Sequence, residues 1–290
     1  MSSAFSETMR MIKIEHSVFA LPYALVSAFW AAGGWPSWQI ILLILAAMVS
    51  ARSAAMAFNR YLDADIDARN PRTTVRSIPA GRLSKSYALG FTLICCAIFL
   101  AITAMINRLT FMLSPLFLLI LLGYSWSKRF TSLCHLLLGL ALGLSPLGAW
   151  AAVTGQLDWA PVWLGLAVMS WTAGFDMIYA CQDIEFDRSE GLFSIPAKLG
   201  VNRTLAVARV FHLAMLAILV WLGIYLDQGW FYGAGVGLVA VLLIYEHALV
   251  WGGNLEKVDV AFFTMNGLVS LLFGLMTIAG VLLSGSVPAV

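Results

Sequence analysis

Long apolar stretches recur along almost the whole of this chain, and they limit what it can fold into. Each approaches or exceeds the roughly 20 residues that an α-helix needs to cross the hydrocarbon core of a membrane. Of the 290 residues, 61% are hydrophobic and 11% are charged, whereas soluble domains carry about 25% charged residues. No stretch reads as a separate soluble domain, so the sequence predicts an all-α integral membrane protein with one domain over residues 1–290. The nine expected spans are about 17–34, 38–59, 86–106, 109–127, 132–153, 161–182, 204–226, 230–250 and 260–284.

Lys and Arg gather on alternate connections between these spans. The N-terminal segment and the connections after the second, fourth, sixth and eighth spans hold almost all of them, whereas the opposite connections hold only Arg108. Because cytoplasmic loops carry the excess of Lys and Arg, we expect the N-terminus and the charged loops in the cytoplasm and the C-terminus outside. The net charge of +2 gives no electrostatic support for a nucleic-acid partner.

Three polar side chains continue the second expected span at its cytoplasmic end, in the stretch FNRYLDADID. Asn59, Asp63 and Asp67 are spaced four and four. Each step of four residues drifts by only about 40° around an α-helix, so the three side chains share one face. Asp65 falls on another face, where we expect it to be solvated.

A second polar motif closes the sixth expected span, in the stretch DMIYACQDIEFD. Asp176, Tyr179, Asp183 and Asp187 are spaced three, four and four, which again predicts one helix face. The loops that follow the two motifs also match, with RSIPAG after the first and FSIPAK after the second. This is typical of a weak internal repeat, with halves of about 1–130 and 131–290.

The carboxylates of the two motifs predict a metal-dependent clamp for a diphosphate. Carboxylates stacked four residues apart repel each other, and ionisable groups within a membrane span indicate function. Oxygen ligands without His or Cys favour Mg²⁺ or Ca²⁺, and Mg²⁺ completes its shell with water and substrate phosphates. We therefore expect about one Mg²⁺ at each motif and a diphosphate between them.

Cations on the same side of the membrane complete the expected clamp, because they can neutralise a bound diphosphate. The alternative is that they only set topology against anionic lipid, which we favour for Arg69, Arg82 and Lys85. The cations that we assign to the clamp are Arg72, Arg76, Lys128, Arg129 and Lys198.

The pattern N-x-x-x-D-x-x-x-D, followed by D-x-x-Y-x-x-x-D-x-x-x-D, resembles the UbiA superfamily of intramembrane aromatic prenyltransferases over nearly the whole chain. The resemblance implies a helical bundle around a central cavity, dependence on Mg²⁺, and transfer of a polyprenyl chain from its diphosphate to an acceptor. It also implies that Asp176 and Tyr179 are site residues. Many ubiquinone-branch members have Asp directly after the motif Asn, where this chain has Arg60, a difference that bears on the subfamily. The metal-binding residues that the resemblance implies are Asn59, Asp63, Asp67, Asp183 and Asp187.

Three segments, 14–24, 51–60 and 179–187, are most similar to bacterial 4-hydroxybenzoate polyprenyltransferase-like enzymes. They are particularly similar to the branch associated with futalosine-pathway menaquinone synthesis, whose implied acceptor is a dihydroxynaphthoate. The resemblance thus implies a bacterial plasma membrane, a polyprenyl diphosphate donor and a small aromatic acceptor. Two acceptors remain open, 4-hydroxybenzoate and a dihydroxynaphthoate.

Two charged residues lie deeper in the expected spans. Arg52 precedes Asn59 by seven residues, which puts it on nearly the same face about 10 Å further into the membrane. We interpret it as a partner for an acceptor carboxylate or for Asp176, with a structural ion pair between helices as the alternative. Asp176 is a candidate to orient or deprotonate the acceptor phenol, and with Asp183 it forms the candidate catalytic pair. We expect His135 to be structural.

Other functions fit this sequence less well. Ion-coupled transporters also have repeats and buried acids, but they bind substrate near the middle of the membrane, whereas these motifs gather at one side. A CDP-alcohol phosphotransferase would carry D-G-x-x-A-R, which the sequence lacks. Within the resembling family, the acceptor could instead be haem, a chlorophyllide or a glycerol phosphate lipid.

Overall fold

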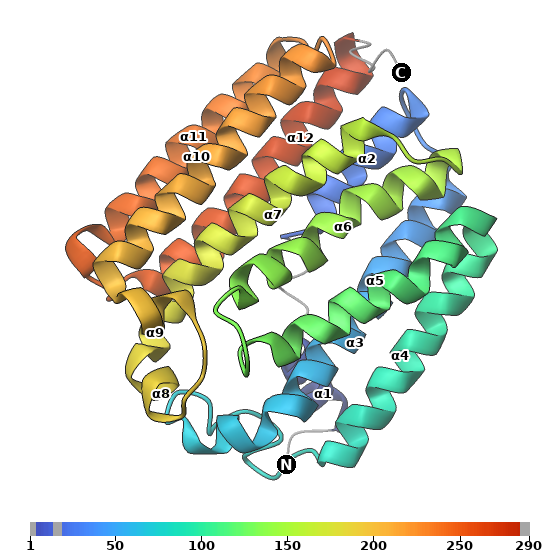
Figure 1. Ribbon diagram of the computed structural model, residues 1–290. Coiled ribbons are helices and arrows are strands. Elements are labelled where there is room, and N and C mark those ends of the chain that lie inside the picture. Colours follow the sequence, from blue (N-terminus) through green and yellow to red (C-terminus); the bar gives the residue numbers. More distant parts are fainter. Residues whose placement is uncertain (1–3, 14–18, 285–290) are drawn as a thin grey trace.

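The computed structural model describes residues 4–13 and 19–284, and the described residues form helices without strands. The long helices run roughly side by side and form one bundle (Figure 1). In chain order they are α1 (Ala4–Ile12), α2 (Leu21–Ala32), α3 (Trp38–Arg69), α4 (Lys85–Ile106), α5 (Arg108–Ser127), α6 (Cys134–Thr154), α7 (Trp159–Ala180), α8 (Ile184–Ser189), α9 (Ile195–Leu199), α10 (Val201–Tyr225), α11 (Trp230–Leu249) and α12 (Asn266–Ser284).

Within the described residues, eight helical segments are long and apolar enough to cross a membrane, which confirms the fold class and eight of the expected spans. The first expected span, 17–34, is shorter in the structure, because α2 has only 12 residues and reaches about 18 Å. Pro22 stands in its first turn, where proline is favoured. Gly33 ends it in the left-handed conformation, with φ 64°. Residues 14–18, which carry part of this expected span, lie outside the described residues.

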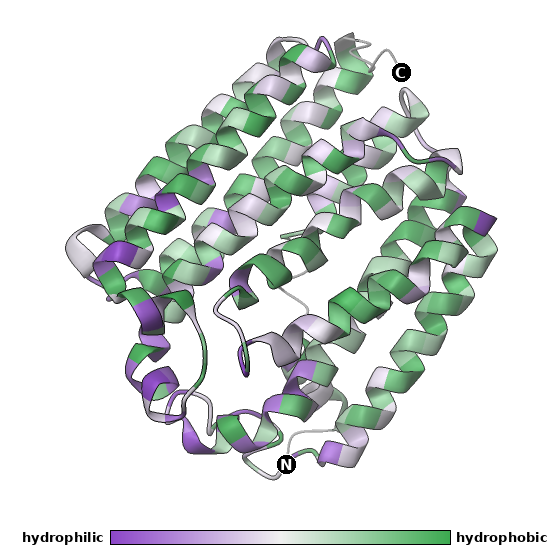
Figure 2. Cartoon of the chain, viewed as in Figure 1, coloured by the Kyte–Doolittle hydropathy of each residue, from purple (hydrophilic) through white to green (hydrophobic). Residues whose placement is uncertain are grey.

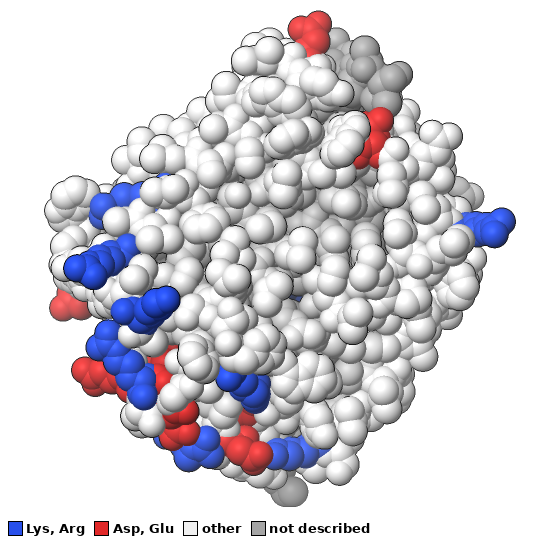
Figure 3. All heavy atoms as spheres, viewed as in Figure 1, with Lys and Arg blue, Asp and Glu red and all other residues white. Residues whose placement is uncertain are grey.

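The charged side chains concentrate at one end of the bundle. The lower end of Figure 2, where α3 ends and α8 and α9 lie, is the most hydrophilic. Most of the charged side chains visible in Figure 3 lie toward this end, and the broad middle of the same face has almost none. Helix α1 lies at this end, whereas α12 finishes at the opposite end (Figure 1). The alternation of Lys and Arg in the sequence thus corresponds to a one-sided charge distribution in space.

Helix α3 is much longer than its expected span of 38–59. It begins after Ser37, whose hydroxyl accepts a hydrogen bond from the Ile40 amide at 3.4 Å, and it continues without a break to Arg69. Its 32 residues extend about 48 Å, so the last part projects beyond a hydrocarbon core of about 30 Å. This projecting part carries the first aspartate motif.

The second aspartate motif does not continue one α-helix, contrary to the prediction. Helix α7 ends at Ala180, a 3₁₀ turn covers Cys181–Asp183, and the short helix α8 begins at Ile184. A 3₁₀ turn winds at 3.0 residues per turn instead of 3.6. The direction of the side chains therefore changes between Tyr179 and Asp187.

Helices α6 and α7 pack with their backbones very close together. A Cβ atom added to Gly139 would lie 2.4 Å from the carbonyl oxygen of Met169, and one added to Gly143 would lie 2.5 Å from that of Gly165. Small residues allow this close approach between membrane helices. The contact fixes α7, which carries part of the second motif, against the beginning of α6.

Candidate active site

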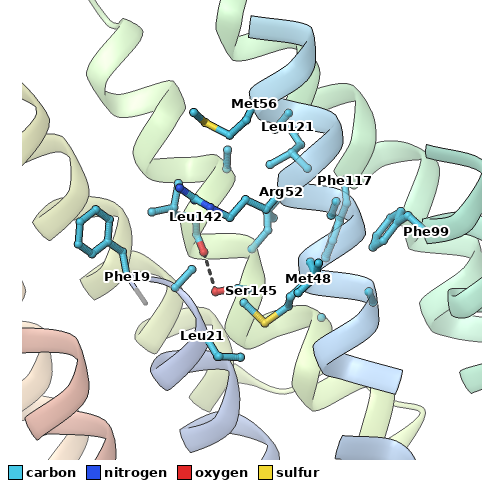
Figure 4. Close-up of a pocket in the computed structure, with 18 of the residues that line it drawn as sticks. Phe19, Leu21, Met48, Arg52, Met56, Phe99, Phe117, Leu121, Leu142 and Ser145 are labelled. Atoms are coloured by element: carbon cyan, nitrogen blue, oxygen red, sulfur yellow. Dashed lines mark hydrogen bonds between the residues drawn. The ribbon is translucent and has the colours of Figure 1, made fainter. Parts of the chain in front are cut away.

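Two adjoining cavities lie inside the bundle, which confirms the expected central cavity. The larger, of about 320 Å³, is mostly apolar and lies between α3, α4, α5, α6 and α7. Arg52 extends into it from α3, among Met56, Leu121 and Leu142 (Figure 4). The smaller, of about 270 Å³, is polar and is lined by both aspartate motifs. The residues that line both cavities, and so mark where they meet, are Arg60, Arg76, Tyr124, Leu138 and Asp176.

The first motif lies on α3, and its acidic members are paired with cations. Asp63 is buried, and it pairs with Lys128 at 2.7 Å and with Arg129 at 2.8 Å, both from the connection between α5 and α6. Asn59 donates a hydrogen bond from Nδ2 to Asp63 Oδ2 at 3.1 Å. Because α3 is unbroken here, the spacing of four brings these side chains together as predicted.

Asp67, one turn further along α3, is buried and half satisfied. Its Oδ1 accepts a hydrogen bond from Arg76 Nη1 at 2.6 Å. Its Oδ2 is buried and has no hydrogen-bond partner within the described part of the chain. An unsatisfied buried carboxylate oxygen is costly, and at the wall of a polar cavity it is typical of a site that receives a ligand.

The second motif reaches the polar cavity from the opposite side. Asp183, in the 3₁₀ turn, and Asp187, on α8, both line it together with Asp176. Asp187 Oδ2 accepts a hydrogen bond from the Ser194 hydroxyl at 2.8 Å. Tyr179 lines the apolar cavity instead, and its ring lies 4.1 Å from that of Phe262, centroid to centroid.

Arg72 connects the two halves of the chain. Its guanidinium donates to Asp183 from Nε at 3.0 Å and from Nη2, and to the Tyr179 hydroxyl at 3.3 Å. Asn70 adds a hydrogen bond to Asp183 at 3.1 Å. Partial burial alone would lower the pKa of Arg72, but its hydrogen bond and charge interaction with Asp183 outweigh burial and raise this pKa above the ordinary value. Arg72 therefore stays charged.

The loop that carries Arg72 and Arg76 is fastened by the N-terminal helix. Glu7 of α1 is 2% exposed. It accepts hydrogen bonds from the Ser77 hydroxyl at 2.7 Å and from Arg82 Nε at 2.8 Å. Ser77 belongs to the RSIPAG stretch, and its counterpart in FSIPAK is Ser194. The two matching loops thus place equivalent serines against different partners, Ser77 against Glu7 and Ser194 against Asp187.

The donor set fits a hard cation such as Mg²⁺. The five side chains that are predicted to bind metal all line one polar cavity: Asn59, Asp63, Asp67, Asp183 and Asp187. Within residues 4–13 and 19–284, no three His, Cys, Asp or Glu side chains already stand together as a metal site. Most of the carboxylates are instead neutralised by Lys and Arg, so metal binding at these residues requires that they exchange those partners.

His135 replaces Arg52 as the partner of Asp176. The sequence suggested an Arg52–Asp176 pair, but Asp176 Oδ2 lies 2.7 Å from Nδ1 of His135. Arg52 and Asp176 both line the apolar cavity. The prediction that His135 is structural misses this contact, because the two residues are 41 positions apart in the chain.

Lys198 stands apart from the other predicted cations. It is an exposed residue of α9 and is absent from the described lining of both cavities. Two further residues of the site were not predicted: Asn70, which contacts Asp183, and Ser194, which contacts Asp187. The repeated SIPA stretch was a usable signal for Ser194, whereas Asn70 carries no recognisable pattern.

Comparison with known proteins agrees with this fold and site. Residues 20–268 match the UbiA prenyltransferase family. The chain is 30% identical over 276 residues to a 4-hydroxybenzoate octaprenyltransferase of Aliivibrio fischeri, covering 94% of each chain. It resembles the apo structure of a UbiA homolog from Aeropyrum pernix K1 with a TM-score of 0.83 and 35% identity, over 91% of this chain and 97% of that one. A UbiA homolog from Archaeoglobus fulgidus, solved with GPP and Mg²⁺, has the same fold, with a TM-score of 0.72 and 22% identity over 95% and 99% of the two chains.

The chain belongs to the UbiA prenyltransferase family. It is an integral membrane protein and a prenyltransferase, as the resemblance of its two aspartate motifs implied.

Proposed function

We propose that this enzyme transfers a polyprenyl group from a polyprenyl diphosphate to a ring carbon of a hydroxylated aromatic acid, in a reaction that depends on Mg²⁺. The observation that carries the proposal is the pair of adjoining cavities. The polar one, lined by five candidate metal-binding side chains and by cations, suits a diphosphate and its metal. The apolar one suits an isoprenoid chain and an aromatic ring. Asp176 lines both.

The polar cavity would hold Mg²⁺ through Asn59, Asp63, Asp67, Asp183 and Asp187. When bound, Mg²⁺ supplies stabilisation of the negative charge that develops on a departing diphosphate. Arg72, Lys128 and Arg129 now pair with the aspartates. They would turn to the phosphate oxygens once metal takes their partners, because guanidinium and ammonium groups bind phosphate strongly. The relative solved with GPP and Mg²⁺ supports this assignment.

The apolar cavity would position the reacting groups and exclude water. Once the C–O bond of an allylic diphosphate breaks, water would quench the cation to an alcohol, so the site must be dry. Residues such as Phe99, Phe117 and Met48 supply an apolar wall. Arg52 would bind the carboxylate of the acceptor, which would orient the phenol toward Asp176, and Tyr179 would contact the substrate beside it.

The acceptor that we propose is 4-hydroxybenzoate or a dihydroxynaphthoate. The Aliivibrio fischeri relative is a 4-hydroxybenzoate octaprenyltransferase, which supports the first. Arg60 stands where many ubiquinone-branch members have Asp, a difference that bears on the subfamily and keeps the second acceptor open. Either product would serve ubiquinone or menaquinone synthesis. We also propose two pseudo-repeat halves, about 1–130 and 131–290, and a plasma membrane orientation with α1 and the polar cavity on the cytoplasmic side, because Lys and Arg concentrate there.

The test is prenylation by the purified enzyme in detergent. With Mg²⁺ and a polyprenyl diphosphate, we expect one of the two acceptors, 4-hydroxybenzoate or 1,4-dihydroxy-6-naphthoate, to gain the mass of the prenyl chain. The product should disappear with EDTA and return with added Mg²⁺. Binding of the diphosphate without product on either ring would contradict the acceptor assignment, and absence of metal-dependent binding would contradict the proposal as a whole.

A further inference from the structure

His135 is buried beside the candidate base and belongs to the cavity of the diphosphate. The residue is 3% exposed, and it lines the polar cavity. Its Nδ1 lies 2.7 Å from Asp176 Oδ2. Its other nitrogen, Nε2, is buried and has no hydrogen-bond partner within the described residues. A buried imidazole is thus joined to Asp176 by a short hydrogen bond.

The direction of this hydrogen bond follows from the chemistry of the partners. An ionised carboxylate only accepts hydrogen bonds, whereas a neutral imidazole carries one N–H and one acceptor nitrogen. When Asp176 is ionised, as a base must be, His135 has to donate from Nδ1.

The backbone holds this pair in a fixed geometry. His135, Gly139 and Gly143 follow one another at intervals of four and so share one face of α6. The two glycines let this face approach α7 until a Cβ would meet its carbonyl oxygens. His135 is thus presented to α7 on the face where the two helix backbones lie very close together.

Asp176 has other groups within the same cavity to which it can turn. Arg52, Arg60, Arg76, Tyr124 and Tyr179 all line the apolar cavity with it. An arginine in contact with Asp176 would compete with the acceptor phenol for the carboxylate. A fixed donor on one oxygen keeps the other oxygen aimed at the cavity, as catalysis by a positioned base requires.

We infer that His135 is a positioning residue that orients Asp176 for removal of the phenol proton of the acceptor. This inference rests on the proposed function. Asp176 takes the phenol proton, and the ring carbon beside the oxygen uses its electron pair to form the C–C bond. The C–O bond of the allylic diphosphate breaks, and its electron pair leaves with the diphosphate. The ring C–H proton is then lost to the departing diphosphate or to water, the aromatic ring re-forms, and Asp176 returns its proton to the oxygen.

The test compares His135→Leu and His135→Asn with the wild-type enzyme. We expect His135→Leu to lower kcat by roughly ten-fold or more, up to the roughly 10²–10⁴-fold that the base itself can contribute, and to change KM for the polyprenyl diphosphate by less than about two-fold. His135→Asn, which keeps a donor, should recover a large part of kcat. His212→Leu is the matched control, because His212 is equally buried but pairs with His247 on α11 and is absent from the described lining of both cavities. This control should keep normal kcat.

A second readout separates positioning of the base from a general packing role. A ring fluorine beside the phenol lowers the phenol pKa and leaves one neighbouring carbon free, as in 3-fluoro-4-hydroxybenzoate. A more acidic phenol depends less on its base, so the ratio of wild-type to His135→Leu kcat should shrink with the fluorinated acceptor. The matching fluorinated naphthoate applies if the wild-type enzyme prefers that ring.

The outcomes are distinct from failure of the proposed function. If the wild-type enzyme prenylates neither acceptor, the proposed function is wrong, and this inference is overturned as well. If the wild-type enzyme is active, an unchanged kcat in His135→Leu overturns the inference alone. A lower kcat with the same ratio for both acceptors, or without recovery in His135→Asn, also overturns it, because a purely structural role gives that result.

Discussion

The two aspartate motifs share their spacing but differ in how the chain holds them. The first lies on the unbroken helix α3, and its acidic members Asp63 and Asp67 are buried against cations. The second passes through a 3₁₀ turn into α8. Asp183 takes its cation, Arg72, from the first half of the chain, and Asp187 accepts a hydrogen bond from the Ser194 hydroxyl. The first motif is thus rigid and neutralised, whereas the second depends on loops.

This difference indicates which half of the site is already formed before a ligand binds. A carboxylate on a continuous helix, fixed by two cations, keeps its position when the ligand leaves. Asp183 and Asp187 are placed by segments that have few helical hydrogen bonds of their own, so their geometry follows the contacts of Arg72 and Ser194. We expect substitutions in the first motif to remove function outright, and those around the second to change affinity.

The largest effect is expected for Asp63→Ala. The change removes a metal ligand and leaves Lys128 and Arg129 without their carboxylate, so kcat should fall by roughly 10²–10³-fold, as for loss of a central electrostatic group. Asp65→Ala is the matched control on the same helix, since Asp65 is exposed and pairs with Lys85. Prenylation rates of both variants measure the difference, and similar losses in the two would contradict the assignment of the α3 face.

A smaller effect is expected for Arg72→Lys. Lysine keeps the charge but loses the forked contact with Asp183, at a cost of about 1.5 kcal/mol, so KM for the diphosphate should rise roughly ten-fold. Since the pKa of Arg72 is raised, the wild-type KM should not change through this residue between neutral and mildly alkaline pH. Steady-state kinetics at two pH values test both statements. An unchanged KM in the variant would show that the contact of Arg72 with Asp183 does not contribute to binding of the diphosphate.

Ser194→Ala and Ser77→Ala sharpen the comparison further. Ser194 supports Asp187 and also caps α9 through the Ala197 amide, whereas Ser77 contacts Glu7. Loss of an N-cap costs about 1 kcal/mol. For Ser194→Ala we therefore expect the Mg²⁺ concentration that gives half-maximal activity to rise roughly five-fold. Ser77→Ala removes one contact to Glu7 and leaves that of Arg82 in place, so it should change the Mg²⁺ titration much less than Ser194→Ala and should lower thermal stability instead. Equal shifts of the Mg²⁺ titration in Ser194→Ala and Ser77→Ala would contradict the prediction that only the Ser194 loop directly supports a metal-binding residue.

The smallest effect is expected for Lys198→Ala. Its side chain is exposed and outside both cavities, and exposed charges contribute little, so KM for the diphosphate should rise at most about two-fold. A rise as large as that of Arg72→Lys would show that α9 closes over the bound diphosphate and that the original grouping of Lys198 with the clamp is right.

Features that depend on a single continuous helix were predicted well from the sequence. The spacing of Asn59, Asp63 and Asp67 needed only the helical period, and it was confirmed because α3 is unbroken. The apolar stretches gave eight spans for the same reason. The prediction for α2 was too long, because hydrophobicity does not report where Pro22 and Gly33 start and stop a helix.

Contacts between distant segments were harder to predict. The 3₁₀ turn at Cys181–Asp183 leaves no mark in the spacing of the second motif. The pairs His135–Asp176 and Asn70–Asp183 depend on how helices pack, and His135 looks like any other histidine in an apolar segment. The glycines that bring α6 against α7 were visible in the sequence, but their partner was not.

The contact of Glu7 with Ser77 and Arg82 has a practical consequence for anyone who handles this enzyme. Helix α1 looks like a dispensable leader of nine residues, and trimming it is a natural first step in preparing a membrane protein for crystals. The loss would release the loop that supplies Arg72 to Asp183 and Arg76 to Asp67. A purification tag therefore belongs after the last helix, and a shortened N-terminus would yield a folded bundle with a poorly assembled site.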